Sequence, residues 1–261
     1  MGMLEGRTVL VSGVGPGLGR ETAAAILRQG GQVVAVDMMG DRVQAICADI
    51  DPGGGRTLAI EVDIASEEQC AAAVPKIVER FGTLDGVVNV AAIDDGTGGL
   101  MDDGLMEEWD QCAEVNVKGT LRITRAMVPL MPQGGSIVLI GSTAFARPRR
   151  TRLALAYGMS KGALVTATYY LAEELGPHGI RTNSVVPGWK LGPVLEGYLD
   201  AESARREIDR QQLVDTISEE LSLRRMATDG DVANAAVFFL SDMARAINGQ
   251  TIFVDGGHVF R

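Results

Sequence analysis

The sequence has few cysteines and almost no histidine. Its 261 residues contain three cysteines, Cys47, Cys70 and Cys112, without a Cys-x-x-Cys pair, and two histidines, His178 and His258. An odd number of widely spaced cysteines predicts reduced thiols rather than a disulfide framework. Two histidines are too few for a typical histidine-based zinc site. We therefore expect neither disulfides nor a bound metal.

Long apolar runs and an excess of positive charge are also lacking. No run approaches the roughly 20 residues that a transmembrane helix needs, and Met1 to Arg7 lack the basic-then-apolar pattern of a signal peptide. The chain has 34 acidic residues against 24 Lys and Arg, a formal net charge of −10. Such a charge repels a phosphate backbone. We expect a cytoplasmic protein that binds neither membranes nor nucleic acid.

Short apolar segments rich in valine and isoleucine alternate with longer amphipathic stretches. Continuous apolar strands are typical of a parallel sheet that is covered on both faces. The alternation predicts one α/β domain over residues 1–261, with a doubly wound sheet of about seven parallel strands and helices on both faces. The predicted strands are Thr8–Ser12, Gln32–Asp37, Thr57–Val62, Leu84–Asn89, Ser136–Ile140, Arg181–Val186 and Thr251–Val254. The predicted helices are Leu18–Gln29, Asp41–Ile50, Glu67–Phe81, Leu105–Leu130, Ala154–Leu175 and Gly230–Leu240.

The segment from residue 187 to residue 226 departs from this alternation. It contains glycine, proline and a charged stretch, Ala201–Gln212, that predicts a helix. A long segment outside the strand–helix rhythm is typical of a movable cover, so we expect a lid here. Val194, Leu195, Tyr198 and Leu199 within it would form either an apolar wall of the substrate pocket or part of the core.

A glycine-rich segment, Ser12-Gly13-Val14-Gly15-Pro16-Gly17-Leu18-Gly19, follows the first predicted strand and opens the first predicted helix. Glycines let the backbone turn sharply and approach a pyrophosphate closely, and the helix N-terminus presents free amides to the anion. The placement predicts a dinucleotide site of the Rossmann type, with a turn that binds no ligand as the alternative. The residues expected to bind are Gly13, Gly15, Gly17, Leu18 and Gly19.

Asp37 ends the second predicted strand, 18 residues after Gly19. This is close to the offset of roughly 20 residues expected for an acid that binds the adenosine ribose. A carboxylate accepts hydrogen bonds from both ribose hydroxyls and repels a 2′-phosphate, which favours NAD over NADP. Arg20 and Arg42 are nearby cations that would weaken this preference. A solvated acid at a strand end is the alternative.

Tyr157 and Lys161 are four residues apart in a predicted helix, so their side chains share one face. Free tyrosine titrates near ~10. An ammonium held beside it would lower the pKa of the phenol, as acid/base catalysis near neutral pH requires. Ser142 follows the strand Ser136–Ile140, where a hydroxyl can orient a substrate carbonyl and stabilise its developing charge. The alternative is a surface Tyr–Lys pair, and Thr143 is adjacent to Ser142.

Together these residues resemble the single-domain members of the short-chain dehydrogenase/reductase family, in the family's order and over essentially the whole chain. The resemblance implies hydride transfer with NAD, a small alcohol or ketone as substrate, and a homotetramer. It implies a catalytic tetrad of Asn116, Ser142, Tyr157 and Lys161, in which Lys161 also binds the nicotinamide ribose and Asn116 holds a relay water. Further cofactor contacts are implied for Asp63, Ile64, Asn89, Ala91, Pro187 and Gly188.

The chain departs from the family's pattern at three places. Val90 and Ala92 replace the usual Asn and Gly after Asn89, which predicts altered packing. Gly192 stands where the family often has a threonine that contacts the carboxamide. The stretch between Ser142 and Tyr157 is about two residues longer than usual. It contains an arginine loop, which would either attract an anionic substrate or form a solvated or subunit-contacting loop: Arg147, Arg149, Arg150 and Arg152.

We therefore expect an oxidoreductase that transfers hydride between NAD(H) and a hydrophobic secondary alcohol or ketone, with Tyr157 as acid/base. The main alternative is a reductase of the 3-oxoacyl-carrier-protein type, which often prefers NADPH, a preference that Asp37 opposes. A non-catalytic dinucleotide-sensing protein would not need Tyr157 and Lys161. An epimerase or dehydratase with a Tyr-x-x-x-Lys pair is usually longer, with a larger C-terminal region.

Overall fold

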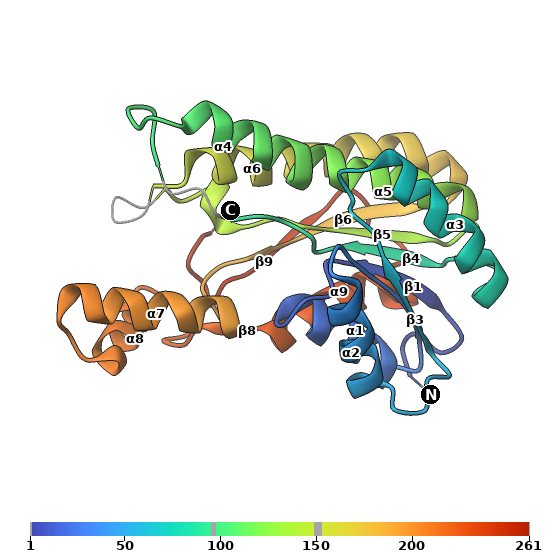
Figure 1. Ribbon diagram of the computed structural model, residues 1–261, viewed down its shortest axis with the longest axis horizontal. Helices are drawn as coiled ribbons and strands as arrows, with labels where there is room; N and C mark the ends of the chain where they lie inside the picture. Colours follow the sequence, from blue (N-terminus) through green and yellow to red (C-terminus); the bar gives the residue numbers. More distant parts are fainter. Residues whose placement is uncertain (1, 95–97, 149–152, 261) are drawn as a thin grey trace.

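The computed structural model describes residues 2–94, 98–148 and 153–260. In these ranges seven parallel strands form one sheet, in the order β3-β2-β1-β4-β5-β6-β9 (Figure 1). The doubly wound sheet that the sequence predicts is thus confirmed. The strands are β1 (Thr8–Ser12), β2 (Gln32–Asp37), β3 (Thr57–Glu61), β4 (Gly86–Asn89), β5 (Ser136–Ile140), β6 (Arg181–Pro187) and β9 (Thr251–Val254).

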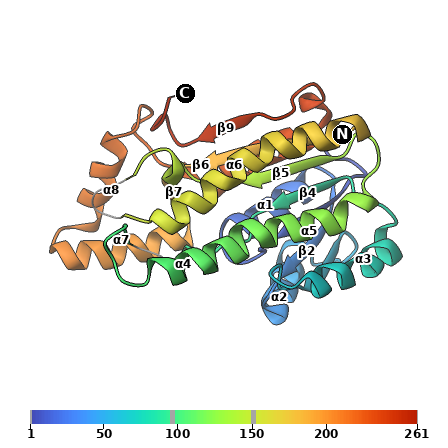
Figure 2. The ribbon, with the colours of Figure 1, turned by 90° about the horizontal axis from the view of Figure 1, so that it is seen from above.

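Helices cover both faces of the sheet (Figures 1 and 2). Side chains alternate between the faces of a strand, so Val9 and Val11 of β1 join one apolar core while Leu10 joins the other. The first core packs under α1 (Leu18–Arg28), α2 (Gly40–Ile50) and α9 (Asp229–Leu240). The second packs under α3 (Glu67–Phe81), α5 (Thr120–Met127) and α6 (Leu155–Leu175). Because each strand contributes side chains to both cores, its sequence is a continuous apolar run.

The predicted helix Leu105–Leu130 is not one regular helix. It consists of α4 (Leu105–Cys112), a π-helical segment (Ala113–Gly119), α5 and a final 3₁₀ turn (Val128–Leu130). Gly119 approaches β3's following loop so closely that a Cβ there would lie 2.9 Å from Ile64 Cγ1. π-Helical turns inside α-helices frequently mark functional sites, and this one carries Asn116.

Residues 187–226 form a helical projection at one end of the sheet (Figures 1 and 2). Helices α7 (Pro193–Arg206) and α8 (Arg210–Glu219) pack on an apolar cluster of their own, and the two-residue strands β7 (Lys190–Leu191) and β8 (Ala227–Thr228) pair at its base. The single helix predicted over Ala201–Gln212 is wrong. Glu207 adopts a left-handed conformation (φ 53°), which ends α7, and the side chain of Asp209 caps α8.

The remaining boundaries differ little from the predicted ones. A capping box opens α9: the Asp231 amide donates to Thr228 Oγ1 at 3.1 Å, and the Thr228 amide donates to the Asp231 carboxylate at 2.9 Å. The side chains of Cys47, Cys70 and Cys112 are buried, and burial raises the pKa of Cys70 to about 11. Within the described ranges, no helix has the length and apolar character to cross a membrane.

Candidate active site

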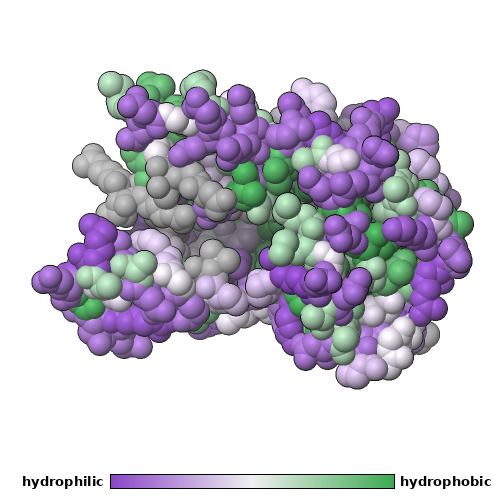
Figure 3. All heavy atoms as spheres, viewed as in Figure 1, coloured by the Kyte–Doolittle hydropathy of each residue, from purple (hydrophilic) through white to green (hydrophobic). Residues whose placement is uncertain are grey.

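A cleft of about 970 Å³ lies at the carboxyl ends of the strands. Because β1 neighbours both β2 and β4, the chain winds in opposite directions on either side of it, and ligands of open parallel sheets bind at such a switch point. Figure 3 shows the surface hollowed between the α7–α8 projection and the body of the molecule. The cleft runs from Asp37 and Arg42 at one end to Tyr157 and Tyr198 at the other.

The glycine loop forms one wall of this cleft, and its backbone requires glycine. Gly13 and Gly17 have φ values of +75° and +103°, a region that side chains disfavour. A Cβ on Gly13 would lie 2.5 Å from Ala91 Cα, and one on Gly19 would lie 2.0 Å from the Gly13 carbonyl oxygen. The N-cap of α1 is Gly17, which has no side chain to bind the first amides. The loop therefore fits a pyrophosphate, and the group that fits the cleft is a dinucleotide.

Acidic side chains line the end of the cleft beyond the loop. Asp37 is 6% exposed, and its Oδ1 accepts hydrogen bonds from the Met39 amide at 2.9 Å and from Arg42 Nη2 at 2.6 Å. Asp63 Oδ1 accepts one from the Ala65 amide at 2.9 Å. Asp37, Arg42, Asp63 and Ile64 all line the cleft. The Asp37 carboxylate can accept hydrogen bonds from the hydroxyl groups of an adenosine ribose. The Arg42 guanidinium lies beside it at the same end of the cleft.

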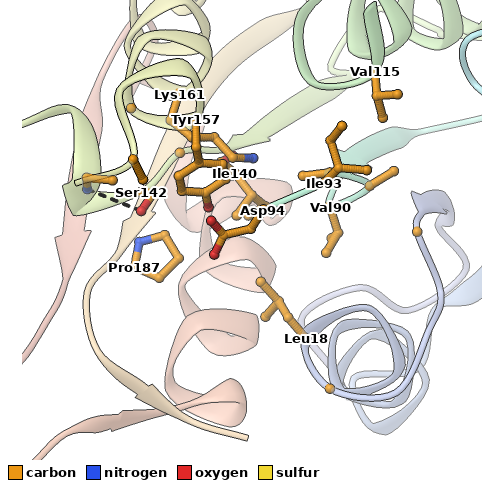
Figure 4. A pocket seen from close by; sticks show the side chains of 18 of the residues that line it. Leu18, Val90, Ile93, Asp94, Val115, Ile140, Ser142, Tyr157, Lys161 and Pro187 are labelled. Carbon is orange, nitrogen blue, oxygen red and sulfur yellow. Dashed lines mark hydrogen bonds between the residues drawn. The ribbon is translucent and has the colours of Figure 1, made fainter. Parts of the chain in front are cut away.

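Tyr157, Lys161 and Ser142 line the opposite part of the same cleft, across from Leu18 (Figure 4). Tyr157 and Lys161 come from the first turns of α6, and the Lys161 Nζ lies 5.6 Å from the centroid of the Tyr157 ring. Ser142 directly follows β5 and Gly141, and its Oγ accepts a hydrogen bond from the Ala144 amide at 3.2 Å. A phenol, a hydroxyl and an ammonium thus converge where a reacting oxygen can be held and can exchange a proton.

The Lys161 ammonium is buried. Its side chain is 2% exposed and its Nζ donates to the Ile140 carbonyl at 3.1 Å. Burial lowers the pKa of Lys161 from 10.5 to about 8, while electrostatic interactions with Asp94 and Cys112 oppose this shift. At neutral pH the group therefore remains mostly protonated. It can stabilise negative charge on a neighbouring phenol.

Asn116 and Asn89 point into the interior rather than lining the cleft. Asn116 is fully buried; its Nδ2 donates to the Ile93 carbonyl and to Ser160 Oγ, both at 3.0 Å, and its Oδ1 accepts from the Ile93 amide at 2.8 Å. Ser160 Oγ in turn donates to the Tyr157 carbonyl at 2.8 Å. Asn89 Nδ2 donates to Thr124 Oγ1 at 2.9 Å. Both asparagines therefore link neighbouring segments beneath the surface of the cleft through hydrogen bonds.

Pro187 and Gly188, at the end of β6, line the cleft. Gly192 follows close by, and a Cβ there would lie 2.3 Å from Asp229 Oδ2. A threonine at position 192 therefore cannot fit while the Asp229 carboxylate is in place. The absence of that side chain has a local physical cause.

The substrate end of the cleft is largely apolar, and one arginine beside it is fixed. Arg147 donates to the His258 carbonyl at 3.0 Å and forms an ion pair with Glu220 at 3.1 Å, which favours a structural role for this residue. Arg149, Arg150 and Arg152 lie outside the described residues. Leu195 and Tyr198 line the cleft, Leu199 is fully buried in the α7–α8 cluster, and the Val194 side chain is not described. Other lining residues are Phe145, Leu153, Leu155, Met159 and Trp189.

Asp94 and Lys190 are two charged residues of the cleft to which the sequence analysis assigned no individual role. Asp94 follows β4 and Lys190 follows the Pro187-Gly188 turn, so each lies just beyond the carboxyl end of a strand. That position was the available signal. The ion pair of Lys190 with Asp229, 39 residues later in the chain, had none.

The chain is similar over almost its whole length to several known proteins. The family described as enoyl-(acyl carrier protein) reductase matches residues 13–258. The short-chain reductase protein NovJ of Streptomyces niveus is 32% identical, over 95% of this chain and 92% of NovJ. The 3-oxoacyl-(acyl-carrier-protein) reductase FabG of Staphylococcus epidermidis is 29% identical, over 96% and 98%. The crystal structure of a putative short-chain dehydrogenase/reductase from Burkholderia xenovorans has a TM-score of 0.88 and 28% identity, covering 99% and 98%.

We expect the buried charge of Lys161 to lower the free energy of unfolding of the protein. The pKa of Lys161 is about 8 in the folded chain, against an ordinary value of 10.5. This lowering of the free energy of unfolding therefore has its full size below pH 8, and it disappears as the pH rises from 8 towards 10.5. We expect Lys161→Met to raise the free energy of unfolding at pH 7 by up to about 3 kcal/mol. The gain should shrink steadily towards pH 10.

Denaturant unfolding of both proteins without added dinucleotide, at pH 7 to 10, measures this difference. Lys76→Met, at an exposed lysine of α3, is the matched control and should show no such pH dependence. A Lys161→Met variant that is less stable than the wild type at pH 7 would contradict the argument.

Proposed function

Because the chain belongs to the short-chain dehydrogenase/reductase family, we propose that it is an oxidoreductase that transfers hydride between NAD(H) and a hydrophobic secondary alcohol or ketone. One observation carries the proposal: Tyr157, Lys161 and Ser142 line the same cleft as the glycine loop. A sensing protein would need the loop alone. The convergence of proton-transfer groups beside a dinucleotide cleft supports catalysis.

The chain's own residues supply proton transfer and positioning, while a bound nicotinamide dinucleotide supplies the hydride acceptor or donor. In alcohol oxidation, the Tyr157 phenolate takes the proton of the substrate hydroxyl; in ketone reduction, the Tyr157 phenol donates it to the carbonyl oxygen. The Lys161 ammonium stabilises the phenolate and binds the nicotinamide ribose. Ser142 Oγ holds the reacting oxygen and stabilises its partial negative charge.

We assign Asn116 a positioning role. Its amide group joins the π-helical segment, the end of β4 and, through Ser160, the backbone of Tyr157, so it fixes where the phenol enters the cleft. In this proposal Asn116 also holds a water molecule, and protons pass between Lys161 and solvent through that water. In this role Asn116 acts through other groups and does not touch the substrate.

We propose NAD as the preferred dinucleotide. A 2′-phosphate on the adenosine ribose would meet the buried Asp37 carboxylate, which repels it. Arg42 is the opposing influence, because its guanidinium lines the same part of the cleft. Its hydrogen bond to Asp37 at 2.6 Å keeps that positive charge engaged with the carboxylate.

The apolar side chains at the substrate end support a hydrophobic substrate. Leu195 and Tyr198 of α7 belong to that wall, and α7 packs with α8 on a separate cluster. We therefore propose that residues 187–226 act as a lid over the substrate, hinged near the β7–β8 pair. Closing such a lid would exclude water from the reacting groups.

A reductase of carrier-bound 3-oxoacyl chains is the second candidate. The similarity to the reductase FabG favours it, and Asp37 opposes the NADPH preference that such enzymes often have. A panel of simple aliphatic and cyclic ketones tested beside an acetoacetyl thioester of pantetheine, each with NADH and NADPH, separates the two functions.

Of the predictions that follow from the proposed function, the first concerns Tyr157. Tyr157→Phe removes the proton that is transferred and should lower kcat for the best ketone of the panel by at least a thousandfold. Because the ring remains, the Kd for NADH from fluorescence titration should change less than twofold. Tyr169→Phe, at an exposed tyrosine of the same helix, is the control. Retention of more than a tenth of kcat in Tyr157→Phe would defeat the role assigned to the phenol.

The second prediction concerns the adenosine end. Asp37→Ala removes the repelling carboxylate and releases Arg42, so the ratio of kcat/KM for NAD to that for NADP should fall at least tenfold. Asp41→Ala, at an exposed acid on the next helix, should leave the ratio within twofold of the wild type. A wild-type protein that uses NADPH better than NADH would contradict the NAD assignment.

The third prediction concerns assembly. We propose a homotetramer in which α6 packs between subunits; Tyr170 on that helix is 73% exposed and would be covered in such an assembly. Light scattering at micromolar concentration should give the mass of four chains. A monomeric mass would refute this assembly.

A further inference from the structure

Lys190 and Asp229 form a shielded ion pair beside the glycine loop. Lys190 belongs to β7 and Asp229 is the first residue of α9; the Nζ–Oδ1 distance is 2.6 Å, and the side chains are 22% and 10% exposed. Removing two charges from water costs free energy that a single contact rarely recovers. A contribution to folding stability alone therefore does not explain this ion pair between two distant segments.

The Asp229 carboxylate lies next to the glycine loop. Asp229 Oδ2 lies 3.4 Å from the place where a Cβ on Gly17 would stand, so it packs directly against the turn that opens α1. A negative charge at this spot opposes the binding of a phosphate at the same helix N-terminus. An acid here is compatible with a pyrophosphate only if a cation neutralises it.

Lys190 is placed to do more than neutralise Asp229. Its side chain lines the same cleft as Gly15 and Gly17, whereas Asp229 lies behind. An ammonium has three donors, and within the described ranges its hydrogen bond to Asp229 uses one of them. The carboxylate thus holds the ammonium close to the glycine loop, and two of its three donors are not used by Asp229.

We infer that Lys190, held in place by Asp229, binds the pyrophosphate of the dinucleotide. The inference rests on the proposed function, because it names a further contact for the same cofactor. It also accounts for Gly192: the Asp229 carboxylate that positions Lys190 occupies the space of a side chain at position 192. The contact that we infer for Lys190 is to the phosphates, and it is therefore distinct from the carboxamide contact of the family's threonine.

Lys190→Met tests this contact, with Lys118→Met as the matched control. Lys118 also forms an ion pair, with Glu114 at 2.9 Å, but is 60% exposed and lies outside the cleft. Calorimetric titration with NADH and with ADP-ribose should show affinities about tenfold weaker in Lys190→Met. Adenosine, measured by displacement of NADH, lacks the phosphates and should bind within twofold of the wild type. Lys118→Met should bind all three ligands normally.

Two further variants keep the test decisive if Lys190→Met folds poorly. Lys190→Arg retains the charge and should keep NADH affinity within about threefold of the wild type. Lys190→Met combined with Asp229→Asn removes both charges and should bind NADH more tightly than Lys190→Met but less tightly than the wild type. Full recovery of affinity in the double variant would show that Lys190 only neutralises Asp229, and would overturn the inference.

The outcomes separate this inference from the proposed function. If the wild type binds NADH and Lys190→Met loses thermal stability but no affinity for NADH or ADP-ribose, the ion pair is a structural tie between β7 and α9, and the inference is wrong. An equal loss for adenosine and ADP-ribose would also contradict it, because the effect would not lie at the phosphates. Failure of the wild type to bind NADH would instead remove the proposed function itself.

Discussion

A lysine ammonium buried at the carboxyl edge of the sheet is the constraint around which the active site is arranged. Lys161 is held by the Ile140 carbonyl at the end of β5 and is influenced by the charge of Asp94. Such burial is unfavourable in itself, so the surrounding elements must be rigid enough to keep the charge in place. The regular part of α6, the sheet beneath it and the bonds of Asn116 supply that rigidity, and the phenol of Tyr157 takes its position from the same helix.

The second half of the site depends on backbone shape rather than on side-chain charge. The glycine loop turns at Gly13 and Gly17 in conformations that favour glycine, and it packs against Ala91 and itself at distances that exclude a Cβ. Because β1, β4 and β5 are neighbours in the sheet, this loop and the side chains of Ser142, Tyr157 and Lys161 face one cleft. Two independent requirements, a tight turn and a buried charge, are thus brought together by the strand order alone.

The sequence predicted those features whose cause is local. Strands β1, β2, β5 and β9 have the predicted bounds because continuous apolar runs and nearby turn residues determine them. The π-helical turn at Asn116, the break between α7 and α8, and the pairing of Lys190 with Asp229 were not predicted. Each depends on contacts between distant segments or on one residue's backbone conformation, which periodicity does not report. For the same reason the inward direction of Asn89 and Asn116 became evident only in three dimensions.

The α7–α8 projection has its own apolar cluster, separate from the two cores of the sheet. Leu199, Leu213 and Ile217 stabilise the pair of helices from within, while Leu195 and Tyr198 face the cleft. Substitutions on the cleft side therefore leave the folding of the sheet largely untouched. Exchange of α7 and α8 alone would replace Leu195 and Tyr198 in the cleft wall, while Lys190 and Tyr157, which lie outside these two helices, keep their places.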